Sequence, residues 1–346
     1  MNGKAFQSSR QFRHSLILLI LGVGLALSVV FALAIGSTQI PPGSIAKLLI
    51  SKAMGIRNNW PEHYEAIIIG VRLPRIILGA FVGAVLGIAG CGMQGLFRNP
   101  MASPYVVGIA SSSAFGASLV IILGLGSMWI GHSAFLFSVS CAFLVYHLAK
   151  VRGTVPVGTL LLAGIAVSIF FSALVSFTQY VAGERELRQI VFWLMGGLWE
   201  GNWNKVVTAL PLAAFGSIGL MCFGRDLNIL LTGEEQAKNL GVDVENVRRM
   251  ALVLSSLVTA TAVAACGIIG FVGLIIPHIM RILVGHDHRV LMPASLLGGA
   301  IFLVWADTLA RTIIAPSELP VGIITAILGV PFFLILLRGR KKQIGL

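Results

Sequence analysis

LILLILGVGLALSVVFALAI, residues 16–35, is an apolar run that contains Ser28 but no charged side chain. A helix needs about 20 apolar residues to cross roughly 30 Å of hydrocarbon, and only helices or closed barrels satisfy their backbone polar groups there. Barrel strands would alternate apolar and polar residues over short stretches, whereas this run is apolar almost throughout. It therefore predicts a membrane-spanning helix.

The rest of the chain repeats this pattern. Of its 346 residues, 57% are hydrophobic and only 11% are charged, and the mean hydropathy is +0.93. These values are typical of a membrane protein. The predicted spans are 15–36, 64–90, 109–126, 130–150, 158–180, 205–222, 246–268, 275–285, 288–312 and 321–338. We expect an all-α polytopic protein with about ten transmembrane helices, forming one transmembrane domain over residues 1–346.

The stretch 275–285 is too short to cross a membrane alone. It is either a partial helix or a continuation of the preceding helix past a break. The series Gly267, Gly270, Gly273 and Pro277 would supply that break.

Gly79, Gly83 and Gly87 recur every four positions in the second span. Such a stripe lies on one helix face and lets a neighbouring backbone approach closely. We interpret it as a packing surface that says little about substrate.

One long charged island interrupts the apolar chain: LLTGEEQAKNLGVDVENVRR, residues 230–249. Gly233 should open a short amphipathic helix with Glu234 and Glu235 at its N-terminal end, and Gly241 can close it in a left-handed cap. The island is a solvated loop or a surface offered to a partner.

Most of the 25 Lys and Arg residues fall on the side of the island and of both termini. The excess of Lys and Arg in cytoplasmic loops predicts that this side is cytoplasmic. The bias also explains the net charge of +12. We therefore expect membrane lipid around the chain and no nucleic-acid partner.

Catalytic motifs are missing from the sequence. It contains no G-x-x-x-x-G-K-[ST] loop, no G-x-S-x-G elbow and no H-E-x-x-H pair. A metal site at His278, His286 and His288 is conceivable, but polar residues in a short turn are ordinarily solvated. Cys91, Cys141, Cys222 and Cys266 have no metal-ligand spacing and read as small core residues. We expect no catalytic residue, no metal and no cofactor.

Several stretches, in order, resemble the permease subunits of ABC importers for iron siderophores, haem and cobalamin. They are RLPRIILGAFVGAVLGIAGCGMQGLFRNPMASPYVVGI, LLLAGIAVS, FWLMGGL, GEEQAKNLGV, GIIGFVGLIIPHIMRILVGHDHRVLMPASLLGGA and ELPVGIITAILGVPFFLILL, which together run from Arg72 to Leu337. The resemblance implies a type II importer with ten helices per permease, a second permease subunit as a homodimer partner, two cytoplasmic ABC ATPases and an external substrate-binding protein. The implied cargo is an iron siderophore or a similar chelate, with cobalamin or haem as alternatives.

The resemblance also implies roles for residues. The cytoplasmic loop at about 225–246 would dock into the ATPase and couple nucleotide-driven motion to the helices. The residues that match the docking loop are Gly233, Glu234, Glu235, Ala237, Leu240, Gly241 and Val242. Arg72, Arg75 and Arg311 match external arginines that receive glutamates of the binding protein. From the residues alone, Arg72 and Arg75 could instead snorkel to the interface, and Arg311 could pair with Asp307 four residues earlier.

A cytoplasmic gate is the third implied site. Asn99 and Met101 follow the second span, and Val157 and Gly158 open the fifth. Val157 and Gly158 replace small hydroxyl residues of the cobalamin-type member, which favours an apolar constriction. Ordinary loop packing is the alternative.

The sequence leaves two other classes of membrane protein as alternatives. A secondary transporter driven by an ion gradient would need ionisable residues buried on its pathway, and Asp307 is the clear acidic candidate within a span. Inverted repeats with paired broken helices, which many such transporters show, are not obvious in the sequence. A membrane-embedded hydrolase is disfavoured by the missing nucleophile and metal motifs.

Overall fold

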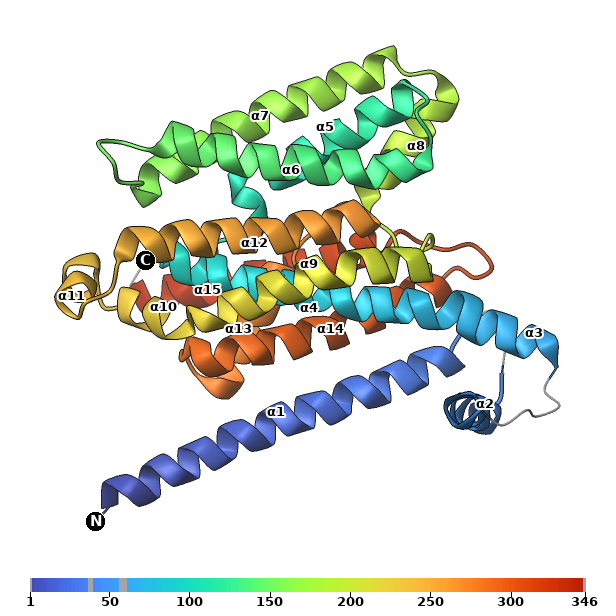
Figure 1. Cartoon of the computed structure of the whole chain (residues 1–346), viewed down its shortest axis with the longest axis horizontal. Helices are drawn as coiled ribbons and strands as arrows, with labels where there is room; N and C mark the ends of the chain where they lie inside the picture. Colours follow the sequence, from blue (N-terminus) through green and yellow to red (C-terminus); the bar gives the residue numbers. More distant parts are fainter. Residues whose placement is uncertain (1, 37–39, 56–60, 345–346) are drawn as a thin grey trace.

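The computed structural model describes residues 2–36, 40–55 and 61–344, and this part of the chain is almost entirely helical (Figure 1). Within these ranges the backbone forms no β-strand beyond an isolated bridge between Val151 and Thr154. The helices are α1 (Asn2–Ala34), α2 (Pro42–Met54), α3 (Glu62–Glu65), the π-helical η1 (Ala66–Arg72), α4 (Leu73–Leu96), the short 3₁₀ turn η2 (Pro104–Val107), α5 (Ile109–Ile122), α6 (Ser127–Ala149), α7 (Val157–Val181), α8 (Glu184–Met195), α9 (Trp203–Cys222), α10 (Gly224–Leu230), α11 (Glu234–Asn239), α12 (Val244–Cys266), α13 (Val272–Val284), α14 (His288–Thr312) and α15 (Val321–Ile344).

Each of the ten predicted spans corresponds to a helix or to a continuous run of helices. In the described part of the chain, seven helical segments are long and apolar enough to cross a membrane, and α5, α13 and the apolar part of α15 are shorter apolar helices. The all-α, polytopic prediction is therefore confirmed. Helix α1 begins and α15 ends on the side of the molecule where α11 lies (Figure 1).

The break before residue 275 has a definite position. Helix α12 ends at Cys266, and Gly267 (φ +73°) and Phe271 (φ +66°) adopt positive φ before α13 starts at Val272. Such φ values cannot continue a right-handed helix. The stretch is thus a separate partial helix. The prediction that Gly273 and Pro277 belong to the break is wrong, because both lie inside α13.

Helices α4 and α14 pack against each other at the centre of the molecule. A Cβ atom at Gly83 would collide with the carbonyl oxygen of Gly299, and one at Gly87 would collide with that of Ser295. The two backbones therefore lie in direct contact, as small residues allow in membrane helices. This confirms that the glycine stripe is a packing surface.

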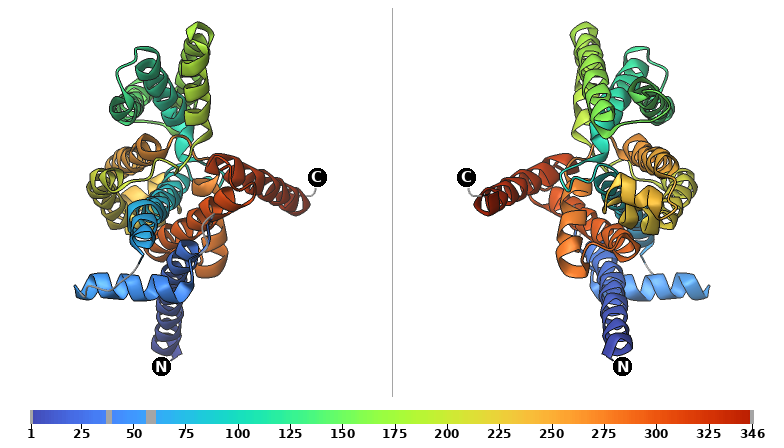
Figure 2. Two further views of the ribbon diagram at one scale, coloured as in Figure 1. Left: turned by 90° about the vertical axis from the view of Figure 1, so that its right-hand side faces the viewer. Right: turned by 90° about the vertical axis from the view of Figure 1, so that its left-hand side faces the viewer.

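Helices at the periphery bury little of their surface. The apolar windows of α1 and α7 are only 17% and 22% buried, against 83% for the window that includes α4. Seen along the long axis, α1, α7 and α15 project outward in three directions, and α2 lies across the end of α1 (Figure 2). Along α1 and α7 many large exposed side chains are apolar, as lipid or another membrane subunit requires.

Within the described residues, three α-helices have no counterpart in the sequence prediction: α2, α8 and α10. Helix α2 follows the first span, and α8 lies between α7 and α9 at the end of the molecule opposite α11 (Figure 1). Cys222 also differs from expectation: it is exposed at the end of α9, whereas the other three cysteines are buried as predicted.

Candidate functional site

The predicted coupling segment, Gly233–Val242, forms a helical knob at one end of the molecule. Helix α11 starts after Gly233 (φ +127°), and Gly241 (φ +82°) turns the chain back so that the Val242 amide donates to the Ala237 carbonyl at 3.0 Å. Ala237 is buried, while Leu240 is 67% exposed. The predicted short helix with a left-handed glycine cap is confirmed. Glu235 and Leu240 are exposed on its outer face.

Arg248, a residue of α12, connects this knob to the rest of the protein. Its guanidinium is 2% exposed and donates to Glu234 at 2.5 Å, to Glu245 at 2.9 Å and to the backbone carbonyl of Val155 at 2.8 Å. Glu245 in turn accepts from the Val155 amide at 3.2 Å. Val155 lies two residues before α7, so α11, α12 and the start of α7 are joined by charge-assisted hydrogen bonds.

The predicted gate residues lie at the start of α7 and in the loop after α4. Asn99 accepts from the Met101 amide at 3.0 Å and closes that loop, and Val157 and Gly158 are the first two residues of α7. The loop leads into η2, which packs against α7: a Cβ atom at Gly164 would collide with the Val106 carbonyl oxygen. Asn99 and Gly158 are exposed, while Met101 and Val157 are half-buried.

The three predicted docking arginines lie together at the opposite end, in a cluster that we call the outer cluster: Arg72, Arg75, Asp307, Arg311 and Glu318. Arg75 donates to Asp307 at 2.8 Å and to Glu318 at 2.8 Å, and Arg311 pairs with Asp307 at 3.1 Å. Arg72 donates to the Leu33 carbonyl at 2.8 Å. The arginines are 6–7% exposed and Asp307 is 2% exposed, so these guanidinium groups hold α4, α14 and the end of α1 together.

The histidine-rich turn is built from structural hydrogen bonds. Asn228 accepts from the His288 amide at 2.8 Å and donates to Asp287 at 2.6 Å. The hydrogen bond from the Arg289 side chain holds the pKa of Asp287 well below its usual range. Over the ranges that the structure describes, no three His, Cys, Asp or Glu side chains lie close enough to share a metal ion.

Sequence reasoning missed the partners that fix these sites. Arg248 and Glu245 were not singled out, although their i, i+3 spacing on α12 is readable in the sequence. Glu318 was also missed. Their long-range contacts, to Val155 and Arg75, have no signal in a single sequence.

Comparison with known proteins agrees with this architecture. Residues 20–339 match the model of the FecCD transport family. The cobalamin import system permease protein BtuC of Halobacterium salinarum is 48% identical over 86% of this chain and 80% of its own length. The hemin transport system permease protein HmuU of Yersinia pestis is 40% identical over 80% of this chain and 85% of its own length.

A solved structure supports the fold. An inward-facing structure assigned to the metal-chelate type of ABC transporter superposes with a TM-score of 0.83, at 36% identity, over 93% of this chain and 99% of its own. The helix order, the α11 knob and the packing of α4 on α14 thus occur in a chain whose relatives are importer permeases. The chain belongs to the FecCD transport family, as a multi-pass ABC importer permease.

Proposed function

We propose that this permease moves an iron siderophore or a similar bulky iron chelate into the cell. It receives the chelate from an external binding protein, works as a homodimer and is driven by two cytoplasmic ABC ATPases. Both of its termini and the coupling segment lie in the cytoplasm, as the bias of Lys and Arg favours. The relatives named for cobalamin and hemin support a metal chelate as cargo.

Cobalamin and haem themselves are the second candidates, because the two relatives carry those names. In this proposal the external binding protein selects the cargo before delivering it to the permease. A titration of the cognate binding protein with ferric siderophores, haem and cobalamin tests the assignment directly. Tight binding of a ferric siderophore supports the proposal, and tight binding of cobalamin or haem alone replaces it.

The observation that carries an ATP-driven mechanism is the Arg248 link. An ATPase seated on α11 would move Glu234, and Arg248 would pass that movement to Val155 and hence to the start of α7. Because the Arg248 guanidinium is buried and held by three acceptors, α11 cannot shift without straining these bonds. The entrance of α7 carries the proposed gate residues Val157 and Gly158.

Arg248→Gln tests this link. We expect ATP hydrolysis by the assembled complex to persist while cargo uptake in proteoliposomes falls, by about 2- to 30-fold, the usual range for a residue that carries coupling between sites. Arg13→Gln, which removes an exposed arginine hydrogen-bonded to the Leu283 carbonyl, is the matched control. Unchanged uptake in Arg248→Gln, with a folded complex, would remove the link from the mechanism.

The outer cluster fits an importer better than an ion-driven transporter. Asp307 pairs with both Arg75 and Arg311, so the carboxylate that an ion-coupled mechanism would require is held between two cations. We further propose that the binding protein docks on the rim around Arg72, Arg75 and Arg311, whose guanidinium groups are 6–7% exposed and would turn outward to meet it. Ion pairs to a partner at this rim would govern its orientation and rate of encounter more than its affinity.

A further inference from the structure

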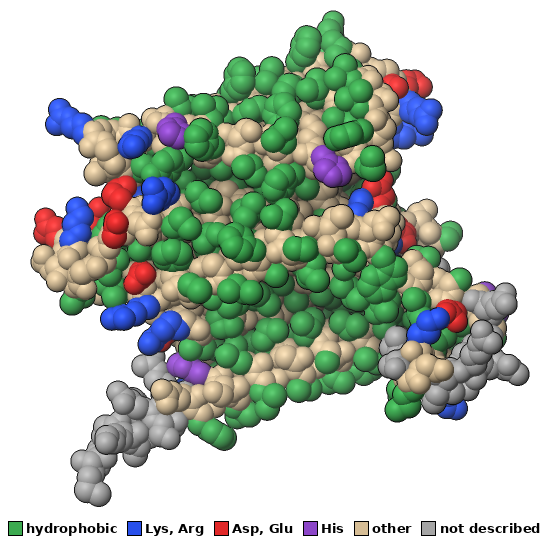
Figure 3. Space-filling view, in the orientation of Figure 1, with side chains coloured by type: hydrophobic (Ala, Val, Ile, Leu, Met, Phe, Trp, Pro, Cys, Tyr) green, Lys and Arg blue, Asp and Glu red, His purple; other side chains and the backbone are tan. Residues whose placement is uncertain are grey.

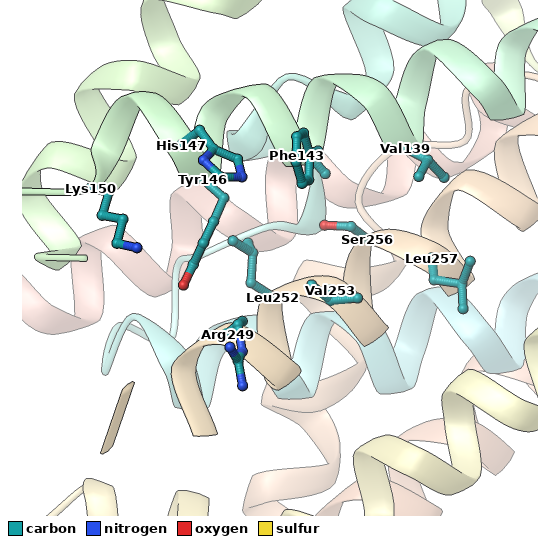
Figure 4. A pocket seen from close by; sticks show the side chains of 11 residues that line it. Val139, Phe143, Tyr146, His147, Lys150, Arg249, Leu252, Val253, Ser256 and Leu257 are labelled. Carbon is teal, nitrogen blue, oxygen red and sulfur yellow. The ribbon is translucent and has the colours of Figure 1, made fainter. Parts of the chain in front are cut away.

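A groove of about 410 Å³ lies between α6 and α12 on the lateral surface of the molecule (Figure 4). Most of its wall is apolar, formed by Val139, Ala142, Phe143, Leu252, Val253 and Leu257. The two helices pack along each other on this face (Figure 1). The groove runs along the helix axes, and its wall is hydrophobic.

One end of the groove is basic. Lys150 and Arg249 lie at that end, beside Tyr146 and His147 (Figure 4). No carboxylate lines the groove. Arg249 donates to the Asn246 side chain at 2.8 Å, and within the described residues neither Lys150 nor Arg249 is ion-paired, unlike the neighbouring Arg248 with its two glutamates. Two exposed positive charges thus border the groove without local compensation.

The surroundings of the groove are those of a lipid-facing surface. Leu136, Phe143 and Leu148 on α6 are 63%, 65% and 60% exposed, and apolar side chains cover this face between its charged ends (Figure 3). The basic end lies on the side of α11, where the anionic leaflet of a cytoplasmic membrane would be. A ligand here would therefore meet hydrocarbon along its length and positive charge at one end.

Ser256 adds a polar group deeper in the groove. It is 3% exposed, and its hydroxyl has no hydrogen-bond partner. The side chain projects between the two helices (Figure 4). A buried hydroxyl is stabilised when it finds an acceptor, and the ester carbonyls of a phospholipid lie between headgroup and acyl chain.

We propose that this groove binds an anionic phospholipid. The phosphate lies between Lys150 and Arg249, Ser256 donates to an ester carbonyl, and one acyl chain lies between α6 and α12. The uncompensated charge selects an anionic over a zwitterionic headgroup, and the apolar wall selects a lipid over a free phosphate. The bound lipid would reinforce the contact between α6 and α12, the helix that carries Arg248.

The test compares lipids retained by the purified full-length permease, counted by native mass spectrometry after incubation with dioleoyl phosphatidylglycerol or dioleoyl phosphatidylcholine. Each basic side chain contributes roughly a fivefold change in affinity for an anionic lipid surface. We therefore expect Lys150→Gln/Arg249→Gln to bind phosphatidylglycerol about 30-fold more weakly. Arg13→Gln/Arg225→Gln, which removes two exposed arginines elsewhere on the same side, should leave this affinity unchanged.

Two further measurements separate the parts of the proposal. Ala142→Phe fills the apolar wall and keeps both cations, so it should also reduce phosphatidylglycerol binding, and inorganic phosphate should not compete. Melting temperatures of all variants identify any that misfold. Equal binding of the two lipids, or phosphatidylglycerol binding that the Lys150/Arg249 variant retains in full, would overturn the proposal. Competition by inorganic phosphate at lipid-like concentrations would overturn it as well, since the apolar groove would then play no part.

Discussion

Gly83 determines how closely the two central helices approach each other. Its missing side chain leaves room for the Gly299 carbonyl of α14. Gly83→Ala should force α4 and α14 apart and destabilise the protein by roughly 1–3 kcal/mol, as overpacking does. The thermal unfolding midpoint in detergent measures this. Gly22→Ala is the control, because a Cβ atom at Gly22 in α1 meets nothing within 4 Å. Equal midpoints for the two variants would contradict the close packing.

Asp307 should contribute more to stability than Gly83 does, because its carboxylate is buried between Arg75 and Arg311. Asp307→Asn would leave two buried cations with too little compensation, so we expect the free energy of unfolding to fall by about 3–5 kcal/mol. Glu200→Gln breaks a surface pair whose glutamate is 64% exposed, and should cost about 1 kcal/mol or less. Titration with a denaturing detergent measures the free energy of unfolding of Asp307→Asn and of Glu200→Gln.

The Asp307 result also bears on docking of the binding protein. If Asp307→Asn is as stable as wild type, Asp307 is not needed to anchor Arg75 and Arg311. Both guanidinium groups could then pair with a partner instead. If stability falls as expected, a docking test must use variants that keep the Arg75–Asp307–Arg311 core. The salt dependence of binding-protein affinity is then the informative measurement.

At the scale of elements, helix α11 could be predicted because its signals are local. Gly233 and Gly241 bound it, and the apolar Ala237 lies on its buried face. Helix α8 was missed because it is short and only half apolar, so hydropathy does not separate it from a loop. The Arg248–Val155 contact joins residues far apart in the chain, and a single sequence carries no signal for such pairs.

The proposed gate residues lie on α7 and in the loop after α4. We expect cysteines introduced at Met101 and Val157 to cross-link between the two permeases in the resting state and to block uptake, because both are half-buried apolar residues at the proposed cytoplasmic constriction. Cross-linked dimers on a non-reducing gel, with uptake measured before and after reduction, provide the readout. A cysteine at Gly22 in α1, far from the pathway, is the control. Equal labelling of residues 101 and 157 by bulky thiol reagents in every nucleotide state would argue against a gate there.

At the scale of the whole molecule, the ten apolar spans were readable because each must satisfy its backbone within the bilayer. Over the described ranges, seven of the corresponding helical segments are long enough to cross a membrane, whereas α5, α13 and the apolar part of α15 are shorter apolar helices. Which side chains meet across spans could not be read, since nearly every face of these helices is apolar. The outer cluster shows this limit: Arg72, Arg75 and Arg311 were placed correctly at one end, but their burial depends on how α1, α4 and α14 pack.

The central claim, that α11 transmits ATP-driven motion to this permease, is tested most directly by uptake into proteoliposomes. They would contain the permease with its ATPase, the binding protein and the ferric siderophore outside, and either wild-type or Glu235→Lys/Leu240→Asp permease. These substitutions change the exposed face of α11 and leave the partners of Arg248 in place. Glu200→Lys at the opposite end is the control. The account predicts ATP-dependent accumulation with wild-type and control permease, and loss of both accumulation and bound ATPase in the α11 variant. Accumulation driven by an ion gradient without ATPase, or full ATP-dependent uptake by the α11 variant, would contradict it.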